Sequence, residues 1–253
     1  MKKILSAIAL ILVSAMCGYS QQENYAPFTA DRPGASTGPA TVGLNVFQIE
    51  QGFGYNRSEG LNTFTFSNTL LRFGLFKNAE IRLSADGLCS SETGINKWSA
   101  AFSGLTAGTK INCFEGRGAI PAISVLAELQ IPGTASEEYG VEHLAPSLYL
   151  LFENFITDWL YICYNVGAQW DGTSPTPGLF LAASLGADIS DKVGTYIESY
   201  NTFAPQGNNY AIDFGFYWSV ARRLQLDISA DLGLNNIRQN WGISLGFAWQ
   251  LNK

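Results

Sequence analysis

Long segments in which apolar and polar residues alternate constrain the fold more than any other feature of the chain. Every second residue is apolar over 210–220, 224–234 and 241–251, and the residues between them are mostly small or polar. Successive side chains of a β-strand point to opposite faces, so a period of two predicts strands. Each segment has about 11 residues, which is twice the usual strand length and close to the ~9–11 residues that a tilted strand needs to cross a bilayer.

The same pattern continues upstream and predicts twelve strands in all. The connections at one end of these strands are mostly two or three residues long, whereas those at the other end, including 56–62 and 202–208, are longer. Outer-membrane barrels have short turns facing the periplasm and longer loops outside the cell. We therefore predict an all-β, transmembrane, antiparallel up-and-down β-barrel. Its predicted strands are 44–55, 63–75, 79–87, 99–113, 120–131, 145–155, 159–170, 179–189, 193–201, 209–220, 223–234 and 241–251.

A soluble β-sandwich would show the same alternation and is the main alternative fold. Trp159, Trp218 and Trp249 fall near one predicted rim, and Tyr210 and Trp241 fall near the other. Trp and Tyr concentrate at the depth of the lipid headgroups because their rings are apolar but carry one polar end. A closed barrel also leaves no strand edge unpaired in lipid. Both points favour the barrel.

Composition and charge exclude two further classes of protein. Only 14% of the residues are charged, against roughly 25% in soluble domains. Beyond residue 17 no apolar run approaches the ~18 residues of a membrane-spanning helix. The net charge of -6 removes the electrostatic basis for binding nucleic acid, which needs clustered Lys and Arg. The expected partners are outer-membrane lipid, a small-molecule solute and the barrel assembly machinery.

The start of the chain predicts export from the cytoplasm. Lys2 and Lys3 precede an apolar stretch and then small residues, which is typical of a secretory signal peptide over 1–20. Residues 21–42 are rich in Pro, Gly, Ser and Thr and form either a periplasmic tether or a plug in the lumen. Small residues at inward positions of the late strands leave space for such a plug or for water. The barrel then occupies 43–253, in the outer membrane of a Gram-negative bacterium.

The polar face of the predicted barrel lines its lumen and carries more acids than bases. Excess carboxylate in a pore favours cations over anions, although a wide barrel also needs polar groups simply to fill its interior. Arg72 and Arg82 fall on adjacent predicted strands, where they would pair with Glu50 or Glu80. The residues predicted to line the transport path are Glu50, Arg72, Glu80, Arg82, Asp86, Glu128, Asp213 and Asp227.

The beginning of the mature chain resembles a known family. It contains Asp31-Arg32-Pro33, followed by a first strand built around Gln48 and Glu50. This pattern resembles the bacterial outer-membrane family labelled "transporter" or meta-pathway phenol degradation protein. The resemblance implies an outer-membrane barrel in which these five residues are the family motif. It also implies uptake of small aromatic or hydrophobic compounds.

His143, the only histidine, is the one candidate for catalysis. It lies in a predicted loop beside Glu142 and near Ser136, but no Gly-x-Ser-x-Gly motif is present. No cysteine pair has metal-ligand spacing, so we expect no metal, no cofactor and no catalytic residue. The sequence therefore predicts a passive outer-membrane channel or transporter for small molecules. A non-conducting barrel that acts through its loops is the alternative, and a barrel hydrolase is a third hypothesis.

Overall fold

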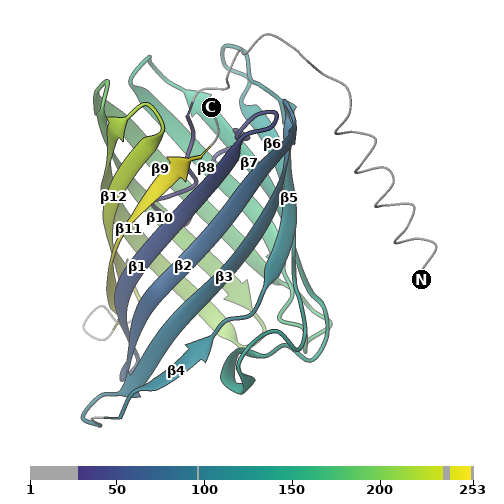
Figure 1. Ribbon diagram of the computed structural model, residues 1–253, viewed down its shortest axis with the longest axis vertical. Coiled ribbons are helices and arrows are strands. Elements are labelled where there is room, and N and C mark those ends of the chain that lie inside the picture. The colour runs from purple at the N-terminus through teal and green to yellow at the C-terminus, as the bar shows by residue number, and fades with distance from the viewer. Residues whose placement is uncertain (1–27, 96, 236–239, 252–253) are drawn as a thin grey trace, which may run out of the picture.

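The strands form a closed antiparallel barrel, as the alternating pattern predicts (Figure 1). The computed structural model describes residues 28–95, 97–235 and 240–251, so the predicted signal peptide and residues 21–27 lie outside the described part. Neighbouring strands pair in chain order, and β1 pairs with β13 to close the ring. The elements are β1 (Phe47–Ser58), β2 (Leu61–Phe76), β3 (Ala79–Glu92), β4 (Ser99–Phe102), β5 (Thr106–Phe114), β6 (Ala122–Gln130), the 3-10 helix η1 (Glu137–Tyr139), β7 (Ala145–Phe155), β8 (Leu160–Gln169), β9 (Gly178–Ser190), β10 (Val193–Ala204), β11 (Gly207–Ala221), β12 (Leu224–Gly233) and β13 (Trp241–Gln250).

The prediction of twelve barrel strands is confirmed, although one of them is interrupted. Both β4 and β5 pair with β3, and together they occupy the predicted strand 99–113. Gly104 lies in the break with a φ of +87°, a left-handed conformation that glycine adopts without strain. The amide of Ser103 still donates to the carbonyl of Asp86 at 2.9 Å. The interrupted strand therefore stays attached to β3.

Two connections predicted to be long loops are tight turns instead. Residues 59–60 alone join β1 to β2, and residues 205–206 alone join β10 to β11. At the first turn the pairing of β1 with β2 continues to Ser58 and Leu61. The two strands therefore include polar residues beyond the part of the sequence in which apolar and polar residues alternate. Glu59 and Gly60 have φ values of 47° and 90°, and two positive φ values are what a type I′ hairpin turn requires. The longer connections at this rim are 93–98, 131–144, 170–177 and 234–240.

The barrel wall is apolar on its outer face and polar on its inner face. Trp218 and Leu245 point outward and are 52% and 51% exposed, whereas the inward side chains of Arg72, Glu80 and Lys110 have no exposed surface. An apolar outer band around a polar interior is the pattern of a barrel that lies in lipid. Within the described residues, no helix combines the length and the apolar character needed to cross a membrane.

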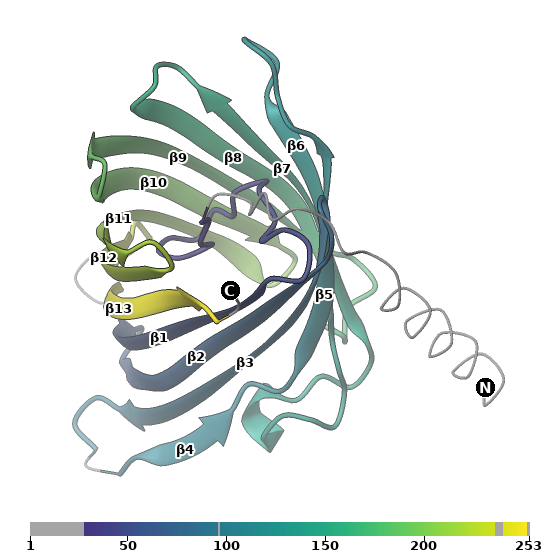
Figure 2. The same cartoon turned by 45° about the horizontal axis from the view of Figure 1, so that its top comes forward.

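The chain passes through the interior of the barrel before it forms β1. Figure 2 shows the stretch that precedes β1 inside the ring of strands. Between Thr29 and Val42 it hydrogen-bonds to side chains of β1, β2, β3, β5, β6, β8, β10 and β12. We call residues 28–46 the inner segment. The family motif Asp31-Arg32-Pro33 therefore lies in the lumen.

Candidate functional site

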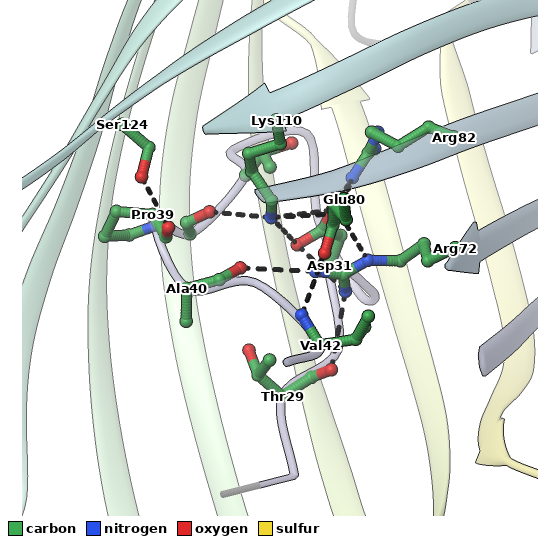
Figure 3. A network of polar contacts seen from close by, with 12 residues as sticks. Thr29, Asp31, Pro39, Ala40, Val42, Arg72, Glu80, Arg82, Lys110 and Ser124 are labelled. Atoms are coloured by element: carbon green, nitrogen blue, oxygen red, sulfur yellow. Dashed lines mark hydrogen bonds and ion pairs between the residues drawn. The ribbon is translucent and has the colours of Figure 1, made fainter. Parts of the chain in front are cut away.

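An ion cluster joins the inner segment to the wall formed by β2, β3 and β5 (Figure 3). The carboxylate of Asp31 lies 2.9 Å from Nζ of Lys110 and 3.4 Å from Nη1 of Arg72, and it also pairs with Arg82. Burial by itself would raise the pKa of Asp31, but Arg72, Lys110 and Arg82 outweigh burial and hold that pKa well below its usual range. Asp31 is therefore an anion at every physiological pH.

Two carboxylates of the wall complete this cluster. Arg72 donates from Nε to Glu80 at 2.8 Å and from Nη1 to Glu50 at 2.8 Å, and Arg82 lies 3.1 Å from Glu80. These are the partners that the sequence predicts for the two arginines. Three acids, including Asp31, then balance three bases, including Lys110. Buried charges are tolerated when they are paired and hydrogen-bonded in this way.

The same carboxylates also bind the backbone of the inner segment. Glu50 accepts hydrogen bonds from the amides of Asp31 and Arg32, and Glu80 accepts one from the amide of Val42 at 2.8 Å. Basic side chains of the wall also bind backbone carbonyl groups of this segment. Lys110 donates to the carbonyl of Gly38, and Arg72 donates to those of Thr29 and Ala40. Hydrogen bonds to ionised groups are stronger than neutral ones, so the wall fixes the path of this segment.

Arg32 occupies a second polar socket, on β1, β12 and β13. Its guanidinium lies 2.9 Å from Asp227, bonds Ser244 at 3.1 Å and also reaches Asn68. The atoms nearest to a Cβ atom at Gly52 would all belong to this guanidinium, two of them at clashing distance. The glycine thus provides the space in which Arg32 lies.

The third anchor lies across the lumen, on β8 and β10. Glu198 accepts hydrogen bonds from the amides of Ala35 and Ser36 at 2.6 and 2.7 Å. Asn165 accepts from the amide of Thr37 at 2.7 Å and donates to its carbonyl at 2.9 Å. The inner segment therefore extends from the wall of β1, β2 and β3 to the wall of β8 and β10.

The structure brings most of the predicted lumen residues into this network. Gln48 donates to Glu50 and to the carbonyl of Thr29, both at 2.8 Å. Glu128 lies 3.4 Å from Arg82, and Asp86 accepts from Asn68, which also binds Arg32. Asp213 lies apart and accepts a hydrogen bond from Tyr196 at 2.9 Å.

Lys110, Glu198 and Asn165 bind the inner segment, and the predicted transport path omits them. Lys110 and Glu198 fall at inward positions of their strands, so the alternation contains the signal that places them in the lumen. Nothing in the local sequence indicates that their partners are backbone groups of residues 31–38, because those contacts join residues more than 70 positions apart. Pro33, the last residue of the motif, lies within the inner segment beside the second cavity described below.

The lumen is electrostatically asymmetric. Strands β1–β5 carry three inward basic residues, Arg72, Arg82 and Lys110, whereas Arg57 pairs in register with Trp241 on the outer face. Strands β7–β13 carry none, although they hold six carboxylates. The acidic half of the lumen is formed by Glu153, Asp188, Glu198, Asp213, Asp227 and Asp231.

Two cavities adjoin the inner segment. One, of about 400 Å³, lies between residues 39–41 and the connection from β5 to β6. The other, of about 290 Å³, lies between residues 28–40 and the acidic half of the lumen. Ala40, Glu153 and Phe155 line both cavities. Open space thus lies beside the segment both at the β5–β6 connection and along β7–β12.

His143 shows no catalytic arrangement. Its Nδ1 lies 3.3 Å from the carbonyl oxygen of Gly172. The nearby hydroxyl of Ser136 accepts a hydrogen bond from the amide of Phe102 instead. Within the described residues, no group of His, Cys, Asp and Glu is arranged to hold a metal ion. The hydrolase hypothesis therefore gains no geometric support.

Comparison with known families decides the classification. The sequence profile of the family described as "Putative MetA-pathway of phenol degradation" matches residues 30–251. The chain belongs to this family. The match covers both the inner segment and the whole barrel, so the two parts are shared features of the family's sequence pattern. A search of curated proteins found no match.

Solved structures of other outer-membrane proteins share the fold of this family member. An outer-membrane channel from Pseudomonas putida F1 superposes with a TM-score of 0.67 at 10% identity, over 87% of this chain and 99% of that one. The KdgM porin, solved in complex with disordered oligogalacturonate, gives 0.55 at 10% identity, over 81% and 99%. The NanC porin gives 0.53 at 10% identity, over 80% and 100%. At this identity the likeness establishes the barrel fold.

Proposed function

We propose that this protein is a passive outer-membrane channel for small molecules, exported by the predicted signal peptide and inserted by the barrel assembly machinery. The observation that carries the proposal is the polar interior, which holds buried charged groups and, beside the inner segment, two cavities. Polar groups would also fill the interior of a wide scaffold barrel, but the open space beside the segment is what a solute path requires. The apolar outer face supplies the contact with lipid.

The inner segment sets the width of the path in this proposal. It is bound to the wall at three separate places, through Asp31, Arg32 and the backbone of residues 35–37. Solutes pass on the side of the segment where the cavities lie. Glu50, Arg72, Glu80 and Arg82 act by holding the constriction in place, since their charges are already paired with one another and with the segment.

Small aromatic or hydrophobic compounds are the solute class that the family suggests. The family description refers to phenol degradation. The smaller cavity is lined by the rings of Tyr161, Tyr196 and Tyr217 and by Phe28. Aromatic side chains offer apolar faces that such solutes can contact during passage.

Planar-bilayer conductance of the refolded mature protein tests the proposal. Folding is first verified by a gel band that shifts on boiling, as a closed barrel requires. We expect discrete conductance steps, and larger steps after deletion of residues 21–41. Replacement of Glu137 by Gln, in the exposed helix η1 at the rim, is the matched control and should leave the steps unchanged.

The anchoring of the inner segment on both sides of the lumen favours one second function, a barrel that conducts nothing and acts through its loops. In that case neither the full protein nor the deletion variant gives conductance steps. That pair of results would contradict the channel. Removal of residues 132–143 would then abolish function, whereas in a channel it spares flux.

A further inference from the structure

The cavity of about 290 Å³ between the inner segment and the acidic half of the lumen is a candidate ligand site. Ligand sites are concave, combine apolar and aromatic side chains with placed polar groups, and have volumes that begin near 300 Å³. Polar groups form the larger share of the surface of this cavity. A space of this size fits a ligand with a single ring. The walls come from six strands, β7 to β12, and from residues 28–40.

Three tyrosines present their rings along this cavity. Tyr161, Tyr196 and Tyr217 each face a glycine of the neighbouring strand in register: Gly186, Gly215 and Gly194. A Cβ atom at any of these glycines would collide with the tyrosine ring. The rings therefore lie flat across the glycines, against the barrel wall. This arrangement keeps the lumen open and turns ring faces toward the cavity.

Two of these tyrosine hydroxyl groups are bound to carboxylates, and the third is bound to a neighbouring tyrosine hydroxyl. Tyr217 donates to Asp188 at 2.5 Å, and the Tyr161 hydroxyl lies 3.2 Å from that of Tyr217. Tyr196 donates to Asp213 at 2.9 Å. The hydrogen bonds fix the rings. The Tyr196 ring also lies close to Gly34 of the inner segment and is only 7% exposed, so Tyr161 and Tyr217 offer the more accessible ring faces.

Glu153 lies where the two cavities meet. Within the described residues, no hydrogen bond or ion pair joins its carboxylate, whereas the other charges beside the cavity are engaged. Lys110 donates to Asp31 and to the carbonyl of Gly38, and Arg32 binds Asp227. Strands β7–β13 provide no Lys or Arg to neutralise Glu153.

We propose that this cavity binds a small organic ammonium ion, with its charge beside Glu153 and Asp188 and its apolar group against Tyr161, Tyr196 and Tyr217. Ammonium groups are attracted both to carboxylates and to the negative faces of aromatic rings. Glu153 would repel an anion, and a neutral aromatic ligand would be stabilised only by stacking on the tyrosine rings. The proposal rests on the proposed channel function, because it names the class of solute that the lumen selects.

Calorimetric titration of the refolded full mature chain in neutral detergent tests this site without any measurement of flux. The probes are benzyltrimethylammonium, which is permanently charged, benzyl alcohol, which is neutral, and benzoate. We expect the ammonium to bind about fivefold or more tightly than the alcohol, and benzoate to bind most weakly. Equal binding of the three probes would overturn the proposal.

Variants locate the binding in the cavity. Glu153→Gln should weaken binding of benzyltrimethylammonium about fivefold, whereas Glu137→Gln, an equal loss of charge at the exposed rim, should not. Tyr161→Leu should weaken binding and Tyr161→Phe should retain it, because the ring face and not the hydroxyl makes the contact. Unchanged affinity in Glu153→Gln and Tyr161→Leu, with folding verified by the heat-shifted gel band, would exclude this site.

The two proposals fail separately. Binding of the ammonium to a barrel that gives no conductance steps would reject the channel and keep the site. Conductance without selective binding would keep the channel and reject the ammonium site.

Discussion

Lys110 of β5 and Asp31 of the inner segment, which are 79 positions apart in the chain, form an ion pair inside the barrel with Nζ 2.9 Å from Oδ1. Lys110 also donates to the carbonyl of Gly38 at 3.0 Å. One lysine thus holds the segment at two points. Because Arg72 and Arg82 bind the same carboxylate, Asp31 is the residue on which the seating of the segment depends most.

We expect Asp31→Asn to release the inner segment from the wall while the barrel itself stays folded. The substitution leaves Arg72, Arg82 and Lys110 facing Glu50, Glu80 and the more distant Glu128, and removal of one partner from a buried ion pair costs about 3–5 kcal/mol. Hydrogen exchange in residues 28–42 should become faster, and conductance steps should become larger. Asp191→Asn, in the turn between β9 and β10, is the control. Unchanged exchange in the Asp31 variant would contradict this role.

The pH dependence of seating follows from the same ion pairs. The pKa of Asp31 is held below its usual range, so its contribution to seating is complete above the unfolded value of about 3.9. The contribution is lost only as the pH falls through the lowered pKa. We therefore expect hydrogen exchange protection in residues 28–42, corrected for the intrinsic exchange rate, to be constant from about pH 5 to pH 8. A loss of protection within that range would show that another group controls the segment.

The alternation of residues predicts the barrel because every strand must separate a lipid face from a lumen face, which is a local property. The break at Gly104 and the turn at Glu59 and Gly60 depend on backbone conformation, which the pattern of apolar residues does not predict. The alternation also places Arg72, Glu80 and Lys110 on the inner face of the barrel. It does not predict which residues of the inner segment contact the wall, because contacts such as that between Glu198 and the amide of Ala35 join distant parts of the chain.

Gly52 should control the position of Arg32 by its size alone. The atoms nearest to a methyl group there all belong to the guanidinium, so Gly52→Ala should displace Arg32 from Asp227 and leave the barrel intact. Loss of this charge-assisted pair is worth about 1.5–3 kcal/mol. We expect faster hydrogen exchange around Arg32. The effect should vanish in the background of Arg32→Ala, as a double-mutant cycle can measure; persistence in that background would refute the steric explanation.

The acidic half of the lumen should determine the preference for cations. Asp213 and Asp231 lie on neighbouring strands as a cross-strand pair, and neither is bound to a Lys or Arg within the described residues. Replacing both with Asn should lower the ratio of cation to anion permeability about twofold, as measured by the reversal potential in a salt gradient. Glu137→Gln at the rim should not change it. An unchanged ratio in the double variant would place the selectivity elsewhere.

Neutralising Glu50 or Glu80 should act differently from neutralising Asp213. Both glutamates balance Arg72 and accept backbone amides of the inner segment, so Glu50→Gln removes an anchor as well as a charge. We expect larger conductance steps together with a changed reversal potential. A change in reversal potential at constant step size would show that Glu50 faces the solute path directly.

The loop 131–144 should support the interrupted strand rather than the solute path. The hydroxyl of Thr134 accepts from the amide of Leu105, and that of Ser136 accepts from the amide of Phe102, both at 2.9 Å. Removing residues 132–143 leaves these two amides without their acceptors, at a cost of about 1–3 kcal/mol each if they stay buried. We expect faster hydrogen exchange in β4 and at Leu105, with the conductance of the channel preserved. Ser136→Ala should reproduce the change at Phe102 alone, and loss of conductance in the truncated protein would show that this loop forms part of the pore.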